Sequence, residues 1–63
     1  MKIIIKEKIK KSTKTIKQIS DEIYITERVI YEWMRGRKIP TLENAYALAK
    51  SIGCKIDDLI TEL

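Results

Sequence analysis

Five polar side chains repeat at a spacing that places them on one face of a short predicted helix. They are Glu27, Arg28, Tyr31, Glu32 and Arg35. Residues three and four apart on a helix are neighbours, and the apolar Ile30, Trp33 and Met34 fall on the opposite face. An arginine guanidinium presents several hydrogen-bond donors in a planar fork, and a carboxylate presents acceptors. The spacing therefore predicts a polar helix face, which either binds a ligand by hydrogen bonding and charge or is simply solvated.

Positive charge is concentrated in the first part of the chain. Residues 1–38 contain 11 basic and 5 acidic residues, whereas residues 39–63 contain 2 basic and 4 acidic residues. A basic part joined to an acidic part suggests a face that binds a polyanion. A solvated lysine-rich surface explains the same charge pattern, so charge alone does not decide between the two interpretations.

Residues suited to catalysis or metal binding are scarce. The chain has no His and a single Cys, and it shows neither a glycine-rich phosphate loop nor a nucleophile with a recognisable partner. Asp57 and Asp58 suit the positive N-terminus of a helix. We expect no enzyme activity, no catalytic residue, no cofactor, no metal and no small-molecule substrate.

The length and composition predict one domain covering residues 1–63. The hydrophobic fraction of 44% is enough for a core, although a chain this short buries a modest share of its surface. No apolar run approaches the roughly 18 residues of a membrane span, and charged residues from Lys6 to Lys10 interrupt any signal sequence. The lone Cys54 suits a reducing compartment. We expect a cytoplasmic protein that does not bind membranes.

Threonines mark three predicted helix starts. Thr15 with Gln18 fits a capping box and predicts a helix over 16–23. Thr26 predicts a helix over about 27–35, and Thr41 predicts one over 42–52. Gly36 and Gly53 suit the left-handed residue that closes a helix. Further helices are expected over about 2–12 and 56–62, and a short extended lead-in at Ile3 and Ile4 is the alternative for the first residues.

The core is expected to form between these helices. The apolar stripe of the fourth predicted helix consists of Leu42, Ala45, Leu48, Ala49 and Ile52. Trp33 falls in phase with the core, which favours burial over a role as a base-stacking platform. Cys54 is expected to be a small hydrophobe rather than a redox switch. Residues 24–26 form a tight turn, and the inward-pointing Ile25 forces the flanking helices to cross steeply.

The joint spacing of five stretches resembles the Cro/C1-type, lambda-repressor-like helix-turn-helix domain of the Xre family. These stretches are residues 30–36 (Ile-Tyr-Glu-Trp-Met-Arg-Gly), 40–45 (Pro-Thr-Leu-Glu-Asn-Ala), 48–50 (Leu-Ala-Lys), 52–53 (Ile-Gly) and 56–59 (Ile-Asp-Asp-Leu). The resemblance runs without a gap from about residue 5 to residue 60. It implies an all-α, five-helix domain that binds double-stranded DNA and regulates transcription. Small size and richness in Ile and Lys suit a repressor of a phage or mobile element.

The resemblance also implies how such a domain meets DNA. The second helix braces against the DNA backbone, and the third enters the major groove. The domain pairs as a homodimer, at least on DNA, so that two recognition helices meet a palindromic operator in successive grooves about 34 Å apart.

The resemblance also implies which residues contact DNA, from their positions in the family pattern. Base contacts are expected from Glu27, Arg28, Tyr31 and Glu32. Phosphate contacts are expected from Lys14, Lys17, Thr26, Arg35, Arg37 and Lys38. Arg28 is the leading candidate, because arginine donates two hydrogen bonds to guanine in the major groove. In the alternative interpretation Arg28 forms an ion pair with Glu32 on a solvated helix face.

Three departures from the family pattern involve four positions. Ile16 stands where the family often has a phosphate-binding Gln, and Tyr24 stands where it prefers Gly. A left-handed Tyr costs roughly 1–2 kcal/mol, so the turn is either strained or differently shaped. Ile9 and Met34 replace a buried Arg–Glu ion pair, and the joint loss leaves no orphan charge.

A protein-binding module is the alternative function. Such an antirepressor, antitoxin or docking domain would have little affinity for DNA. The carboxylates of Glu27 and Glu32 and the missing Gln at position 16 favour it, whereas Arg28 and the basic cluster over residues 35–38 favour DNA.

Overall fold

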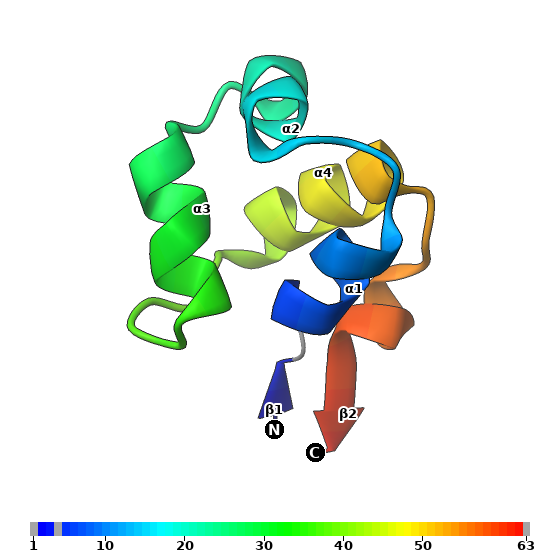
Figure 1. Ribbon diagram of the computed structural model, residues 1–63. Helices are drawn as coiled ribbons and strands as arrows, with labels where there is room; N and C mark the ends of the chain where they lie inside the picture. Colours follow the sequence, from blue (N-terminus) through cyan, green and yellow to red (C-terminus); the bar gives the residue numbers. More distant parts are fainter. Residues whose placement is uncertain (1, 4, 63) are drawn as a thin grey trace.

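The computed structural model describes residues 2–3 and 5–62, and over these residues it contains four α-helices, one 3-10 helix and a two-stranded sheet (Figure 1). In chain order the elements are β1 (Lys2–Ile3), α1 (Ile5–Lys11), α2 (Ile16–Ile23), α3 (Glu27–Met34), α4 (Leu42–Ile52), η1 (Ile56–Leu59) and β2 (Ile60–Glu62). The predicted bounds of α2 and α4 are confirmed. The α3 helix ends one residue before the predicted Arg35.

Threonine hydroxyls begin three of the helices, as the sequence predicts. Oγ1 of Thr15 accepts a hydrogen bond from the Gln18 amide at 3.1 Å, and Oε1 of Gln18 accepts one from the Thr15 amide at 2.8 Å. This pair is a complete capping box. Thr26 and Thr41 cap α3 and α4 by accepting from the backbone amide three residues later. Each such cap stabilises a helix by about 1 kcal/mol.

Glycines end α3 and α4. After α3, the Arg37 amide donates to the Glu32 carbonyl at 2.9 Å and the Gly36 amide donates to the Trp33 carbonyl at 3.1 Å. These two bonds form a Schellman motif, which requires a left-handed residue at its centre. Gly36 has φ 75° and Gly53 has φ 76°. The α3 helix therefore stops sharply, and the basic residues beside Gly36 lie in a defined turn.

Isoleucine dominates the core. The buried cluster consists of Ile5, Ile9, Ile19, Ile30, Trp33, Leu48, Ala49 and Leu59. Trp33 is only 5% exposed, so its predicted place in the core is confirmed. Ile25 packs against this cluster from the turn between α2 and α3, as expected. Burying a side chain of this size stabilises the fold by roughly 1.5–3 kcal/mol, so the core fixes how α2 and α3 cross.

The two ends of the chain differ from the predicted helices over 2–12 and 56–62. The strands β1 and β2 pair antiparallel, with Lys2 opposite Glu62, and lie side by side at one end of the molecule (Figure 1). Cross-strand pairing satisfies backbone groups that a helix would have satisfied internally. The extended lead-in is confirmed at Ile3, whereas Ile4 lies outside the described residues.

A single tight turn replaces most of the predicted last helix. The Asp58 amide donates to the Lys55 carbonyl at 2.9 Å, and the Lys55 amide donates to Oδ2 of Asp58 at 3.1 Å. These short-range bonds close η1 within four residues. The chain then extends into β2, because its backbone pairs with β1 instead of continuing a helix.

The burial predicted for α4 is confirmed except at its first residue. Ala45, Leu48 and Ala49 are buried, but Leu42 is 67% exposed. Leu42 is the first residue of α4 and lies on the same side of the helix as Ala49, two turns later, so its exposure reflects its place at the end of the helix. The predicted stripe therefore began too early in the helix.

Candidate nucleic-acid interface

The outer face of α3 presents the polar residues that the sequence singles out. The side chains of Glu27, Arg28, Tyr31 and Arg35 are exposed, and that of Glu32 is half-buried. Ile30 and Trp33 anchor the opposite face in the core. Since α3 lies along one side of the bundle (Figure 1), its outer face is open to a ligand along the whole helix.

The charged groups on this face have no ion-pair partner among the side chains that the structure describes. Among the described side chains, the ion pair within 4.0 Å is between Lys14 and Glu22. The alternative pairing of Arg28 with Glu32 is therefore absent. The guanidinium of Arg28 keeps its donors available, which is the condition for two hydrogen bonds to one acceptor group.

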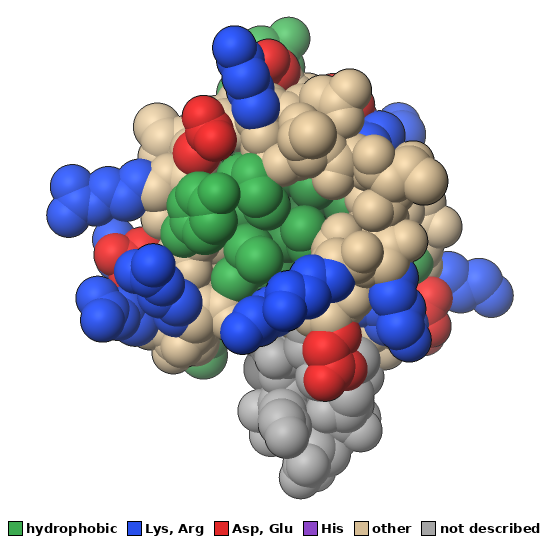
Figure 2. All heavy atoms as spheres, viewed as in Figure 1, with side chains coloured by type: hydrophobic (Ala, Val, Ile, Leu, Met, Phe, Trp, Pro, Cys, Tyr) green, Lys and Arg blue, Asp and Glu red, His purple; other side chains and the backbone are tan. Residues whose placement is uncertain are grey.

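A basic turn follows the face. Arg35, Arg37 and Lys38 are all exposed around Gly36. Positive charge at the C-terminus of a helix also interacts favourably with the helix dipole, but the dipole effect fades within one turn and Lys38 lies beyond it. Figure 2 shows Lys and Arg side chains projecting toward the edge of the molecule, around a central apolar patch. The turn thus extends the polar face of α3 with groups suited to an anion.

The turn between α2 and α3 keeps the left-handed shape in spite of its tyrosine. Tyr24 has φ 59° and ψ 37°, and its side chain is 92% exposed. The Ser20 hydroxyl donates to the carbonyl of Ile25 across the turn. Of the two possibilities considered above, the strained turn is confirmed. A left-handed residue thus stands in the turn at the position where the resembled family prefers Gly.

The comparison with protein families agrees with this geometry. A model described as helix-turn-helix matches residues 5–59, a stretch that runs from the start of α1 to the end of η1. The chain belongs to the Cro/C1-type helix-turn-helix family. Domains of this family bind DNA and are not enzymes. Comparisons with curated proteins and with solved structures give no match.

Two departures from the pattern of this helix-turn-helix family are explained by packing. Ile16 is half-buried and packs against the core, so it replaces a polar group of α2 with an apolar contact. Ile9 is 5% exposed, and Met34 packs against the same cluster. The positions of the missing ion pair are thus both apolar, as predicted, and leave no buried charge.

Lys14 has a partner that the sequence did not reveal. Its ammonium lies 2.6 Å from Oε1 of Glu22, and the same oxygen accepts from the Ser51 hydroxyl at 3.0 Å. These hydrogen bonds, first that of Lys14 and then that of Ser51, lower the pKa of Glu22. A phosphate would compete with Glu22 for Lys14, whereas Lys17 is exposed at the first turn of α2. No spacing rule predicts the three-residue network, because its members come from three separate segments.

The remaining predicted contact, Thr26, lies exposed at the start of α3 with its hydroxyl engaged in the helix cap.

Cys54 is half-buried, and burial raises the pKa of its thiol, which suits a packing role. Among the described side chains, those of residues 5–59, no cluster of acidic and thiol groups is placed to hold a metal ion. None of the described helices is both long enough and apolar enough to cross a membrane.

Proposed function

We propose that this DNA-binding domain is a sequence-specific transcriptional repressor that reads the major groove with α3. The observation that carries the proposal is the outer face of α3, where Arg28 is exposed together with Glu27 and Tyr31 and has no ion-pair partner among the described side chains. An arginine so placed discriminates guanine by about 1–3 kcal/mol through two hydrogen bonds.

The other residues of this face have separate roles in the proposal. The carboxylates of Glu27 and Glu32 accept hydrogen bonds from cytosine amino groups, and Tyr31 contacts a thymine methyl group. Phosphates are bound by side chains that flank the face: Lys14, Lys17, Thr26, Arg35, Arg37 and Lys38. Such contacts fix the register of the protein on the duplex without reading sequence.

Two copies act together on a palindromic operator in this proposal. A recognition helix of eight residues spans only a few base pairs, and pairing doubles the sequence that is read. The two half-sites are then separated by one helical turn, about 10 base pairs from centre to centre.

Selection of bound duplexes from a random pool, followed by sequencing, tests the proposal. We expect enrichment of one motif repeated as an inverted pair at that spacing. Recovery of duplexes without a shared motif would contradict sequence-specific recognition, and a single unpaired motif would contradict the homodimer.

The second candidate is a protein-binding module with little DNA affinity, which the half-buried Ile16 and the two carboxylates of α3 favour. A salt titration of binding to random duplex separates the two functions. For a DNA-binding regulator, the logarithm of the binding constant falls linearly with the logarithm of the salt concentration. The slope is about −0.9 for each phosphate that the protein neutralises. Absence of binding at low salt would favour the protein-binding module.

A further inference from the structure

The outer side of α4 is a second exposed surface, separate from the face of α3. It presents Leu42, which is 67% exposed, and Tyr46, which is 57% exposed, together with exposed Glu43 and Lys50. Large apolar side chains that share a helix side with charged residues of both signs are typical of an association surface. None of the four residues has a role in the proposed contacts with DNA.

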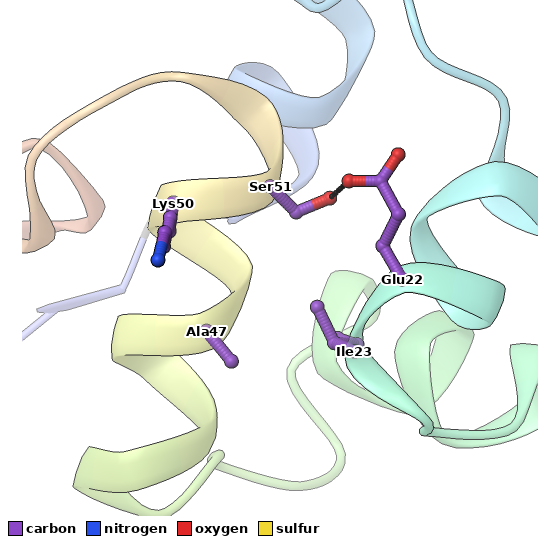
Figure 3. A pocket seen from close by; sticks show the side chains of 5 residues that line it. All are labelled: Glu22, Ile23, Ala47, Lys50 and Ser51. Atoms are coloured by element: carbon purple, nitrogen blue, oxygen red, sulfur yellow. Dashed lines mark hydrogen bonds between the residues drawn. The ribbon is translucent and has the colours of Figure 1, made fainter.

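A hollow borders this surface. It has a volume of about 410 Å³ and lies between α2 and α4, lined by Glu22, Ile23, Ala47, Lys50 and Ser51 (Figure 3). Figure 3 shows its two sides, with Ala47 and Lys50 coming from α4 and Ile23 from α2. Ala47 follows Tyr46 in the chain, so each molecule carries an exposed aromatic ring and a partly apolar hollow side by side.

We propose that this side of α4 docks a second copy of the chain, with the two α4 helices antiparallel about a two-fold axis between Tyr46 and Ala47. The inference deepens the proposed function, since it names the surface through which the homodimer pairs. In a two-fold contact the same patch serves both molecules and must be complementary to itself.

The charges of α4 meet this requirement. Glu43 and Lys50 are equally distant in sequence from the point midway between Tyr46 and Ala47. In an antiparallel pair, Glu43 of one copy therefore faces Lys50 of the other, and the reciprocal pair forms at the same time. Opposite charges that face each other twice favour this register over shifted ones.

The aromatic ring of one copy is also placed against the hollow of the other. Across the same axis Tyr46 of one copy faces Ala47 of the other, at the edge of the hollow between α2 and α4. Tyrosine is a frequent anchor of protein interfaces, because it buries a large ring and keeps a polar hydroxyl for hydrogen bonding. Glu22 and Lys50 at the hollow offer partners to that hydroxyl.

The helix dipole is the competing explanation of the charges. Glu43 lies in the first turn of α4 and Lys50 in the last, where acidic and basic groups respectively stabilise any helix. The dipole predicts that reversing either charge lowers thermal stability and leaves self-association unchanged.

Sedimentation equilibrium without DNA tests the inference, with the full chain at concentrations from about 10 µM to 1 mM, the range of weak complexes. The variants are Glu43→Lys, Lys50→Glu and an equal mixture of the two. Each single variant places like charges opposite each other twice and is expected to weaken association at least about fivefold. In the mixture, mixed dimers regain both attractive pairs, and association is expected to return to the unsubstituted level.

Tyr46→Ala supplies an independent measurement. Loss of the anchor is expected to weaken association about tenfold, whereas Tyr24→Ala removes an exposed tyrosine outside the surface and leaves association unchanged. Circular dichroism verifies that every variant is helical. Monomeric behaviour of the unsubstituted chain throughout, or a mixture no better than the single variants, overturns the inference. Since no DNA is present, this outcome is distinct from a failure of the duplex selection.

Discussion

Tyr24 carries the backbone strain of the turn that joins α2 and α3. Its φ of 59° lies in the left-handed region, which costs a residue with a Cβ atom roughly 1–2 kcal/mol. The side chain is 92% exposed, so burial of the ring offsets little of this strain energy. The sequence identified this position, because a tyrosine replaced the expected glycine, but it did not decide between a strained turn and a different one.

Tyr24→Gly is therefore expected to stabilise the fold. Glycine removes the strain but costs more backbone entropy on folding. Because the strain is the larger of the two free energies, the free energy of unfolding is expected to rise by about 0.5–1 kcal/mol. Urea unfolding measures the free energy of unfolding of both proteins. Tyr24→Ala keeps the Cβ atom and is the matched control, with no gain expected. An unchanged or lower stability of the glycine variant would contradict the strain.

Glu22 ties the segment before α2 to α4 through Lys14 and Ser51. Folding lowers the pKa of this carboxyl below its ordinary value of 4.5. A lowered pKa in the folded state means that the unfolded chain binds the proton more tightly. The network therefore stabilises the fold fully above about pH 5, and this stabilisation is lost as the pH falls through the folded pKa.

The difference in stability between the unsubstituted protein and Glu22→Gln is expected to follow this course. It is largest at neutral pH and shrinks as the pH falls below the ordinary pKa of the carboxyl, because both proteins then carry a neutral group at position 22. Urea midpoints measured between pH 7 and pH 3 check it. Glu7→Gln removes an exposed carboxylate of α1 outside the network and is the control. A difference that stays constant with pH would contradict the role of the ion pair.

At the scale of elements, helices with local signals could be predicted and pairings between distant segments could not. The capping box of Thr15 and the left-handed Gly53 act within a few residues, so the bounds of α2 and α4 follow from the sequence. The strands β1 and β2 pair residues about 60 positions apart. Neither strand has an alternating sequence pattern from which it could be predicted.

The features of the candidate site also divide into those that local patterns predict and those that depend on packing between distant segments. The outer face of α3 could be predicted, because helical periodicity alone decides which residues oppose Ile30 and Trp33. The link from Lys14 to Glu22 and the exposure of Leu42 could not, because both depend on how separate elements pack. The side of α4 that other elements leave open is a tertiary property.

Ile30 holds α3 in the fold and is completely buried. Ile30→Ala is expected to lower the free energy of unfolding by about 2–5 kcal/mol, since it removes apolar contacts and leaves a cavity. For a domain of this size that loss is a large share of the total stability. Urea unfolding measures it, with the half-buried Val29→Ala as a milder comparison on the same helix. A loss below about 1 kcal/mol would show that α3 is not anchored through this residue.

At the scale of the whole molecule, the proposal assigns different tasks to two surfaces. The outer face of α3 and its basic turn bind the duplex, while the outer side of α4 binds a second copy. The uneven charge of the chain fits this division, since Arg35, Arg37 and Lys38 belong to the first part and Glu43 to the second. Attraction to phosphates is then strongest beside α3, where bases are read.

The most direct measurement of this account compares the dissociation constants of three proteins for the selected duplex and for a scrambled duplex. Arg28→Ala is expected to reduce the preference for the selected sequence by about tenfold or more. Lys38→Ala is expected to weaken binding to both duplexes by the same factor, because a phosphate contact carries no sequence information. Equal losses on the two duplexes for Arg28→Ala would contradict the claim that α3 reads the operator.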